Sequence, residues 1–237
     1  MADGIYVGMA AAAARTAQLD SVADNLANAQ SPGFKASRPA FQSFLPSRGS
    51  GDKILTGAVA TGTDLTPGVM VPTERALDVV PQRDTFLAVQ TAGGGRAYTR
   101  NGNIELDPEG LLTIAGHPLL DDKGEPLVLP PGSTNPIISE LGDVFVDGDP
   151  VGRIGSYAIN GPLDRLGGTL LAPAAGAQVT NVIDGTFRSG MLEQGNAPAL
   201  EATIQMISSQ RNFDSAMQAI QTYKKMDERA VEIGRIR

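Results

Sequence analysis

The sequence predicts an α+β protein in which long N- and C-terminal helices pair as a coiled-coil-like segment. An antiparallel β domain is inserted between these helices in the sequence. Apolar residues recur at spacings of three and four near both ends of the 237-residue chain, as they do along one face of a helix. The middle of the chain instead alternates short β-prone runs with turn residues. We therefore expect four segments. They are an N-terminal helix with a following motif (1–35), an extended connector (36–75), the β domain (76–190) and a C-terminal helix (191–237).

The N-terminal segment predicts one long helix over roughly residues 3–29. Seven of its residues are spaced alternately by four and three, which is the spacing of a heptad seam. They are Ile5, Met9, Ala12, Thr16, Leu19, Ala23 and Leu26, and only Thr16 is polar. The helix ends before Pro32, because proline disfavours helical geometry at the residue that precedes it. Gly33 then allows a turn with positive φ.

The stretch DNLANAQSPGFK (residues 24–35) places two asparagines near the end of this helix. Each asparagine costs about 0.5 kcal/mol relative to alanine in a helix. Asn25 and Asn28 are three residues apart, so both amides project to one side. We expect them to fix the register of a helix–helix contact in which Leu26 and Ala27 supply close packing, while Phe34 anchors the chain as it leaves the helix.

The central segment predicts an antiparallel β domain after a Ser-, Thr-, Gly- and Pro-rich connector. Short runs such as TFLAVQT, NIELD and DVFVDG are separated by turn residues. We expect hairpin-type turns at Asn101-Gly102, at residues 107–110 and at residues 122–124. The run of three glycines at 93–95 is typical of a flexible hairpin tip, because it lacks the context of a phosphate-binding loop.

The C-terminal segment predicts a second long helix that continues to about Ile233. Asn196 is the expected N-cap, with Pro198 in the first turn. An apolar stripe follows at spacings of mostly three and four. It comprises Met206, Phe213, Met217, Ile220, Tyr223, Ala230 and Ile233. Two arrangements remain open: the terminal helices form a layer on the β domain, or they pair apart from it and leave apolar surface for other subunits.

Composition excludes several classes of protein. The net charge is −7, and residues 76–190 contain 14 acidic against 7 basic residues, so the chain lacks the basic face of a nucleic-acid binder. The absence of cysteine excludes disulfides and zinc–thiolate sites. No apolar stretch reaches the length of a membrane span. Residues 5–14 resemble a signal peptide, but the only charge before Arg15 is Asp3, so we expect no cleaved signal.

The sequence offers no group of residues that predicts catalysis, a cofactor or a metal. His117 is the only histidine and lies next to a proline between two strand-like runs, where a structural role is expected. Asp147 and Asp149 lack the spacing of a calcium-binding loop and predict a turn. We therefore expect a protein that is not an enzyme.

The motif Asn25-Leu26-Ala27-Asn28, followed by Ser31-Pro32-Gly33-Phe34-Lys35, resembles the signature of the flagellar basal-body rod and hook family. The family pattern usually has asparagine where this chain has Asp24 and threonine where it has Ser31. The resemblance extends through the central segment LDVVPQRDTFLAVQT and the C-terminal segment that begins SGMLEQGNAPALEATIQ, and it covers nearly the whole chain. Within the family, the short length and LTIAGHPLL favour the proximal-rod type over the distal-rod type.

The resemblance implies a structural subunit whose terminal helices form an inner tube and whose β domain lies outside it. It implies no cofactor. The implied partners are copies of the same chain, other rod proteins and the flagellar type III export apparatus. The implied location is the periplasmic rod of the basal body. Two alternatives remain: a distal rod protein of the same family, or a secreted β-domain binding module.

Overall fold

The computed structural model describes residues 2–44, 55–82, 84–133 and 135–235. The chain divides into two compact units. We call the first the helical unit, which comprises Met1–Ala27, Ser37–Gly62 and Pro198–Arg237. We call the second the β unit, which comprises Asn28–Ala36 and Thr63–Ala197. The chain therefore enters the β unit twice, and the domain limits expected from the sequence remain a prediction.

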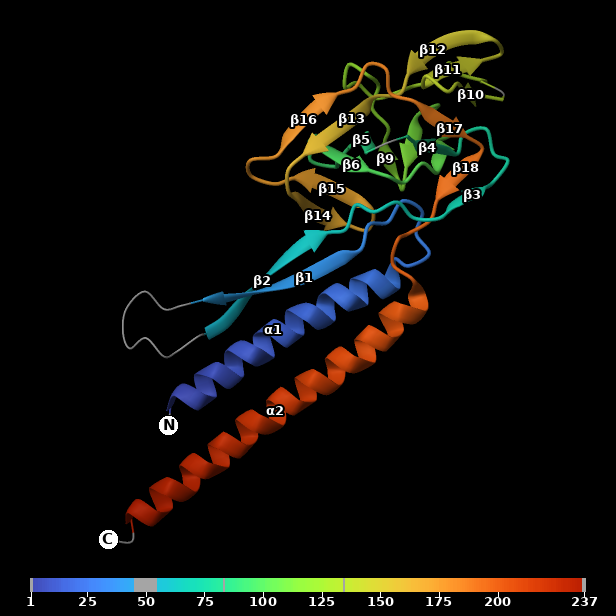
Figure 1. Ribbon diagram of the computed structural model, residues 1–237. Coiled ribbons are helices and arrows are strands. Elements are labelled where there is room, and N and C mark those ends of the chain that lie inside the picture. The colour runs from blue at the N-terminus through green and yellow to red at the C-terminus, as the bar shows by residue number, and fades with distance from the viewer. Residues whose placement is uncertain (1, 45–54, 83, 134, 236–237) are drawn as a thin grey trace. The chain divides into compact units, whose positions relative to one another are not determined.

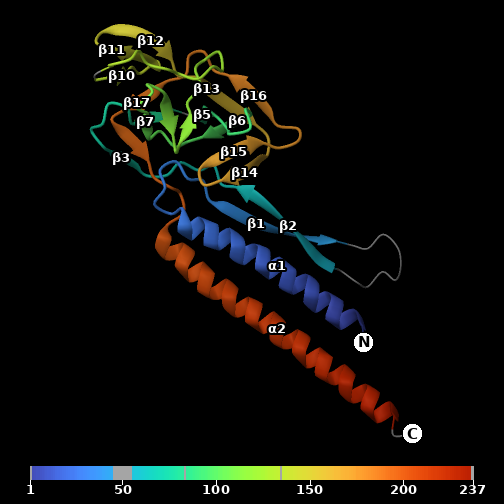
Figure 2. The same ribbon diagram turned by 180° about the vertical axis from the view of Figure 1, so that it is seen from behind.

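The helical unit contains two long helices that run antiparallel, side by side (Figures 1 and 2). Helix α1 spans Ala2–Ala27 and α2 spans Ala199–Arg235, so at 1.5 Å per residue they are about 39 and 55 Å long. Strands β1 (Ser37–Phe44) and β2 (Leu55–Thr63) form a two-stranded sheet, and β1 lies against α1. Among the helices that the structure describes, none is both long enough and apolar enough to cross a membrane.

Both helices were predicted, but the end of α1 and the start of α2 differ from expectation. Helix α1 ends at Ala27, two residues before the expected end, and Asn28 lies in the turn that follows. Helix α2 begins at Ala199, and the carbonyl of Pro198 accepts its first backbone bond, from the amide of Ala202. The prediction that Asn196 is the N-cap is wrong, because its side-chain oxygen accepts from the Ala36 amide instead.

The β unit is built from short strands, and every pair with an assigned register is antiparallel. Its largest sheet has the order β14-β15-β6-β5-β13-β16. These strands are β14 (Leu163–Gly167), β15 (Leu170–Pro173), β6 (Arg96–Thr99), β5 (Thr85–Gln90), β13 (Ser156–Asn160) and β16 (Gln178–Asn181).

Two three-stranded sheets and two strand pairs complete the β unit. One sheet comprises β7 (Ile104–Leu106), β8 (Leu112–Ile114) and β9 (His117–Pro118); the other comprises β10 (Ile137–Ile138), β11 (Asp143–Val146) and β12 (Asp149–Arg153). The pairs are β4 (Val79–Pro81) with β17 (Phe187–Ser189), and β3 (Met70–Pro72) with β18 (Met191–Glu193). The last two strands thus return to the part of the chain that opens the unit.

The core of the β unit lies on both faces of the central strand β5. Successive side chains of a strand point to opposite faces. Leu87 and Val89 accordingly join the larger apolar cluster, while Phe86 and Ala88 join the second. This two-sided burial explains why the run TFLAVQ is almost continuously apolar.

The turn predictions are confirmed at three of four places. The glycine run 93–95 connects β5 to β6, residues 107–110 connect β7 to β8, and the Asp121 amide donates to the Glu125 carbonyl across the third turn. The hairpin expected at Asn101-Gly102 is wrong. A Cβ atom on Gly102 would lie 1.6 Å from the Val79 carbonyl oxygen, so the glycine allows two backbones to approach.

Candidate functional site

The segment that follows α1, residues 28–36, folds as a tight turn within the β unit. The Ser31 amide donates to the Asn28 carbonyl (2.9 Å), and the Phe34 amide donates to the Ser31 carbonyl (3.2 Å). Gly33 has φ +68°, and a Cβ atom there would lie 2.1 Å from the Asn101 nitrogen. Glycine is therefore required by its backbone angle and by the space available. We call residues 28–36 the motif segment.

Phe34 fixes the motif segment in the β unit through apolar packing. Its side chain is fully buried and forms a small cluster with Ala36 and Ala197. The guanidinium of Arg165 lies over its ring, 4.5 Å from the centroid, and also donates to the Lys35 carbonyl. Phe34 therefore packs among residues of the β unit, and its expected role in anchoring the chain against the helix stays a prediction.

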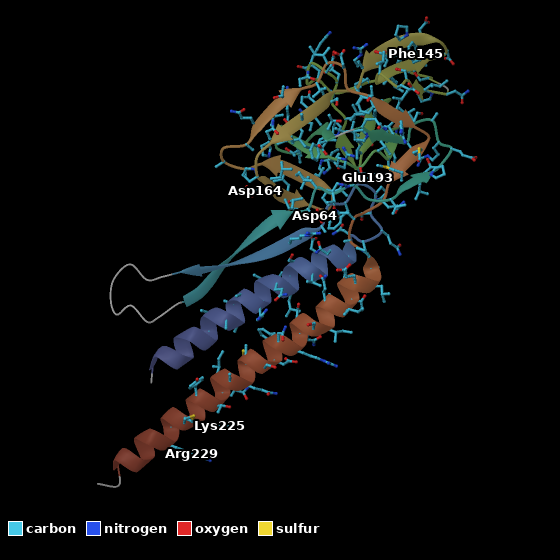
Figure 3. The ribbon with its side chains drawn as sticks, viewed as in Figure 1. Asp64, Phe145, Asp164, Glu193, Lys225 and Arg229 are labelled. Atoms are coloured by element: carbon cyan, nitrogen blue, oxygen red, sulfur yellow. The ribbon has the colours of Figure 1, made fainter. Side chains whose placement is uncertain are left out.

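Lys35, Arg100 and Glu193 form a buried group that we call the ion cluster. The Glu193 side chain is fully buried, and its carboxylate accepts four hydrogen bonds; Figure 3 labels this residue within the β unit. One oxygen accepts from Lys35 Nζ (2.6 Å) and from the Gly68 amide (2.9 Å). The other accepts from Arg100 Nε (3.0 Å) and Nη2 (2.7 Å). Such a bidentate pair has strong charge assistance.

The two cations of the ion cluster have further partners. Lys35 Nζ donates to the Thr66 carbonyl (2.8 Å), and Arg100 Nη1 donates to the Thr85 carbonyl (2.6 Å). The cluster therefore joins the motif segment, the chain after β2, the central sheet and β18. Its buried polar atoms are hydrogen-bonded, as stability requires of buried charges.

Burial and neighbouring charges together shift two ionisation equilibria in the ion cluster. Burial lowers the pKa of Lys35, and the hydrogen bond to Glu193 offsets this only in part. Burial alone raises the pKa of Glu193, but the Lys35 hydrogen bond and the Arg100 charge outweigh burial and hold that pKa below its usual value. The carboxylate is therefore strongly favoured in its ionised form.

Backbone bonds connect the motif segment directly to the chain that precedes α2. The Gly33 amide donates to the Glu193 carbonyl (2.6 Å), and the Asn196 amide donates to the Phe34 carbonyl (3.2 Å). The Asn196 side chain accepts from the Ala36 amide (2.6 Å) and donates to the Asp64 carbonyl (2.8 Å). The segment that leaves α1 and the segment that leads to α2 are thus held to one another.

Asn25 makes a comparable connection inside the helical unit. Its side chain is buried, and it donates to the Ser37 carbonyl (2.9 Å) and accepts from the Ser37 amide (2.8 Å). Asn28 lies outside the helix and accepts a weak bond from the Ser31 hydroxyl (3.4 Å). The two amides therefore have different surroundings within one chain, and their expected role in register between helices stays a prediction.

The least exposed face of α2 follows a seven-residue repeat. Along it, small residues alternate with large ones. The face comprises Ala202, Met206, Ser209, Phe213, Ala216 and Ile220, of which Ala202 and Ser209 are buried. Three members of the predicted stripe therefore lie on this face, whereas Met217 and Tyr223 are exposed.

A second apolar face of α2 is exposed. Leu200, Ile204 and Ile207 are 76%, 60% and 51% exposed and lie on the side of the helix opposite to Ala202 and Ser209. On α1, Met9 is 55% exposed and Leu19 is half-buried, while Ser21 and Val22 are the more buried residues. The side chain of Ile5 lies outside the described residues.

No sequence pattern indicates the ion cluster, because a buried charge looks like an exposed one in a single sequence. Lys35 is part of the motif that follows α1, and Glu193 and Asn196 lie in the C-terminal segment that resembles the family, but Arg100 gives no signal. The geometry supports a structural role, since the carboxylate of the cluster has its hydrogen-bonding capacity filled.

Comparison with known proteins gives three family matches along the chain. Residues 5–35 match the flagella basal body rod protein family, residues 82–146 match the D1 domain of flagellar hook protein FlgE/F/G, and residues 188–233 match the C-terminal domain of flagellar basal body rod FlgEFG proteins. The Escherichia coli flagellar basal-body rod protein FlgF is 37% identical over 93% of both chains. The Salmonella typhimurium FlgF is 35% identical over 98% of both chains.

The chain belongs to the flagellar basal-body rod protein family. It is a structural rod subunit of the FlgF, or proximal-rod, type, and its location is the flagellar basal body. The Bacillus subtilis rod protein FlgG is 26% identical over 99% of this chain, so the distal-rod alternative is not favoured. The family match at residues 5–35 includes the motif segment as far as Lys35, and the match at residues 188–233 includes Glu193.

Proposed function

We propose that this rod subunit assembles through its terminal helices, which pair as a coiled-coil-like segment and present apolar side chains to neighbouring subunits. The seven-residue repeat along α2 supports the pairing, because alternating small and large side chains allow close interdigitation with α1. Other rod proteins and copies of the same chain are the partners. The proposed assembly is helical, since a heterologous contact that repeats without closing builds a tube.

The observation that carries this proposal is the exposed apolar face of α2. Leu200, Ile204 and Ile207 form one contiguous row on a helix that also packs on α1 and whose buried residues, Ala202 and Ser209, lie on the opposite side. A soluble chain that stays alone has little use for such a row, whereas an assembly buries it. A secreted binding module would require no such row on its terminal helix.

We further propose that the flagellar type III export apparatus delivers the chain to the periplasmic rod with its N-terminal helix intact. The alanine-rich stretch at residues 10–14 lies inside α1, so cleavage by a signal peptidase there would remove part of this helix. The mass of the rod-incorporated protein tests this directly. A mass that corresponds to loss of residues from the helix contradicts the proposal.

A structural role without catalysis is also part of the proposal. Among the described residues, no group of three or more acidic or histidine side chains is placed to hold a metal ion. His117 is half-buried in the short strand β9. The rod family matches provide the main support, because they describe a structural protein.

Complementation of a strain that lacks the chain tests the assembly surface. Ile204→Ser with Ile207→Ser should abolish incorporation into purified basal bodies and motility, while the purified variant keeps its melting temperature because both side chains are exposed. Gln210→Ser with Asn212→Ser, also exposed on α2 but away from that row, is the matched control and should restore motility. Normal rods with the isoleucine variant would contradict the proposal.

A further inference from the structure

The ion cluster brings together residues that are far apart along the chain. Glu193 follows Arg100 by 93 positions and Lys35 by 158 positions. Glu193 is therefore the last of the three residues to be synthesised. It is also the only anion of the ion cluster. It is supplied by β18, which pairs with β3 and immediately precedes the segment that leads to α2.

The position of the motif segment depends on this late part of the chain. If the motif segment docked without Glu193, Lys35 and Arg100 would be two buried cations without their shared carboxylate. Removing one partner of a buried ion pair is strongly unfavourable, because the remaining charge is left uncompensated. Three bonds to the motif segment also come from residues 193–196: those to Gly33, Phe34 and Ala36.

Neighbouring charges do not replace Glu193. The carboxylate of Asp64 lies close enough to influence the Lys35 charge. One of its oxygens, however, accepts from the amide and the hydroxyl of Thr66. Asp64 is also partly exposed, whereas the Lys35 and Glu193 side chains are buried.

We propose that Glu193 acts as a latch. The motif segment docks onto the rest of the β unit only after β18 has joined that unit. The point from which α1 leaves the β unit is then fixed by the C-terminal part of the chain. This inference rests on the proposed function. The latch prevents a chain that lacks its C-terminal part from presenting α1 in the register needed for assembly. It thereby controls when α1, one of the two helices of the proposed assembly surface, becomes anchored.

Hydrogen exchange of the full-length protein in dilute solution tests the latch. In Glu193→Gln, the amides of Gly33 and Ala36 should exchange at least about 100-fold faster than in the wild type, and close to the unprotected rate. The amides of Leu87 and Val89, which lie in the central sheet, should remain protected. The exposed Glu201→Gln change removes the same charge from α2 and should leave the exchange of both groups unchanged.

The double variant Glu193→Gln with Lys35→Met isolates the role of charge. It removes one of the two uncompensated cations, so the motif segment should regain protection relative to Glu193→Gln alone. Exchange as fast as in the single variant overturns the latch. It is also overturned if Gly33 and Ala36 keep their protection in Glu193→Gln.

Lys35→Met alone keeps the test informative if Glu193→Gln unfolds the whole β unit. This variant retains the Arg100–Glu193 pair, so only the motif segment should lose protection. Loss of protection at Leu87 and Val89 as well would overturn the latch, because the cluster would then support the entire unit. The exchange measurement involves no rod, so its failure leaves the assembly proposal intact, and failure of assembly leaves the latch intact.

Discussion

At the scale of single residues, Glu193 makes several buried interactions that no sequence pattern predicted. Its carboxylate binds one lysine, one arginine and one backbone amide, and the Lys35 hydrogen bond and the Arg100 charge hold its pKa below the usual value. A group with a lowered folded pKa stabilises the protein above its unfolded pKa. That stabilisation is lost as the pH falls through the folded pKa.

The first prediction concerns the acid stability of the β unit. The free energy of unfolding should decrease as the pH falls from the pKa of an unfolded glutamate, about 4.3, through the lowered pKa of folded Glu193. In Glu193→Gln this contribution should be absent, and the variant should be about 3–5 kcal/mol less stable near neutral pH because two buried cations lose their carboxylate. Urea unfolding at several pH values measures both effects. Parallel pH profiles for the two proteins would show that Glu193 does not supply this dependence.

The second prediction separates two reasons for glycine in the motif segment. Gly33→Ala should destabilise the β unit by more than Gly94→Ala, which should cost about 1–2 kcal/mol. Both residues have positive φ, but a Cβ atom at Gly33 meets the backbone of Arg100 and Asn101, whereas nothing lies within 4 Å of one at Gly94. Chemical denaturation of the two variants measures the difference. Equal losses would mean that the close approach is unimportant.

At the same scale, the sequence predicted a turn but could not predict its partners. Pro32 and Gly33 indicate a chain reversal through their own backbone preferences. The partners Arg100 and Glu193 are brought to Lys35 by strand pairing across more than 90 residues, which no local pattern encodes. The predicted cap at Asn196 failed for the same reason, since Ala36 took its side-chain oxygen.

At the scale of elements, the two helices were predictable because their apolar spacing is sustained over many turns. The strands were predictable as short runs between turn residues, although the pairing of β17 with β4 and of β18 with β3 was not. Single-strand patterns carry no information about distant partners. Asn101-Gly102 shows the limit of prediction from local patterns. The same dipeptide occurs in hairpin turns and, as here, where two backbones approach closely.

The third prediction concerns the seven-residue repeat of α2. Phe213→Ala should abolish incorporation into rods while leaving the thermal transition of the β unit unchanged, since Phe213 belongs to the helical unit. Burial of a phenylalanine in the assembled rod makes its loss worth about 3–5 kcal/mol. Calorimetry of the dilute protein, together with recovery of basal bodies, checks both parts. A large decrease in the β-unit transition would contradict the assembly role.

The fourth prediction contrasts the two asparagines at the end of α1. Asn25→Leu should destabilise the helical unit by about 1–3 kcal/mol, because the Ser37 amide and carbonyl both lose their partner. Asn28→Leu should disturb assembly more than folding, because Asn28 lies in the turn after the helix. Circular dichroism melting and motility of complemented cells distinguish the effects. Normal rods with Asn28→Leu would remove Asn28 from the assembly account.

At the scale of the whole molecule, the division into a helical and a β unit explains why the ends of the sequence have helical periodicity and its middle has short β-prone runs. The β unit contains three buried apolar clusters, whereas the helical unit leaves large apolar side chains exposed on both helices. A chain built in this way has one part that is stabilised by its own core. In the proposed assembly, the other part gains further buried surface from neighbouring subunits.

The fifth prediction follows from this contrast. Limited proteolysis of dilute protein should degrade the terminal helices first and leave a core that includes residues 75–190. In purified basal bodies the same helices should resist the protease. Mass spectrometry of the fragments identifies the boundaries. Full protection of residues 1–30 in dilute protein would contradict the prediction.

The most direct test of assembly through the terminal helices is a side-chain-resolution structure of the chain inside a purified basal body. The account predicts that α1 and α2 contact neighbouring subunits and that Leu200, Ile204 and Ile207, exposed in the single chain, become buried there. It also predicts that Lys35 and Arg100 remain bonded to Glu193 in every copy. A rod in which those three apolar side chains face solvent, with subunits joined only through their β units, would contradict it.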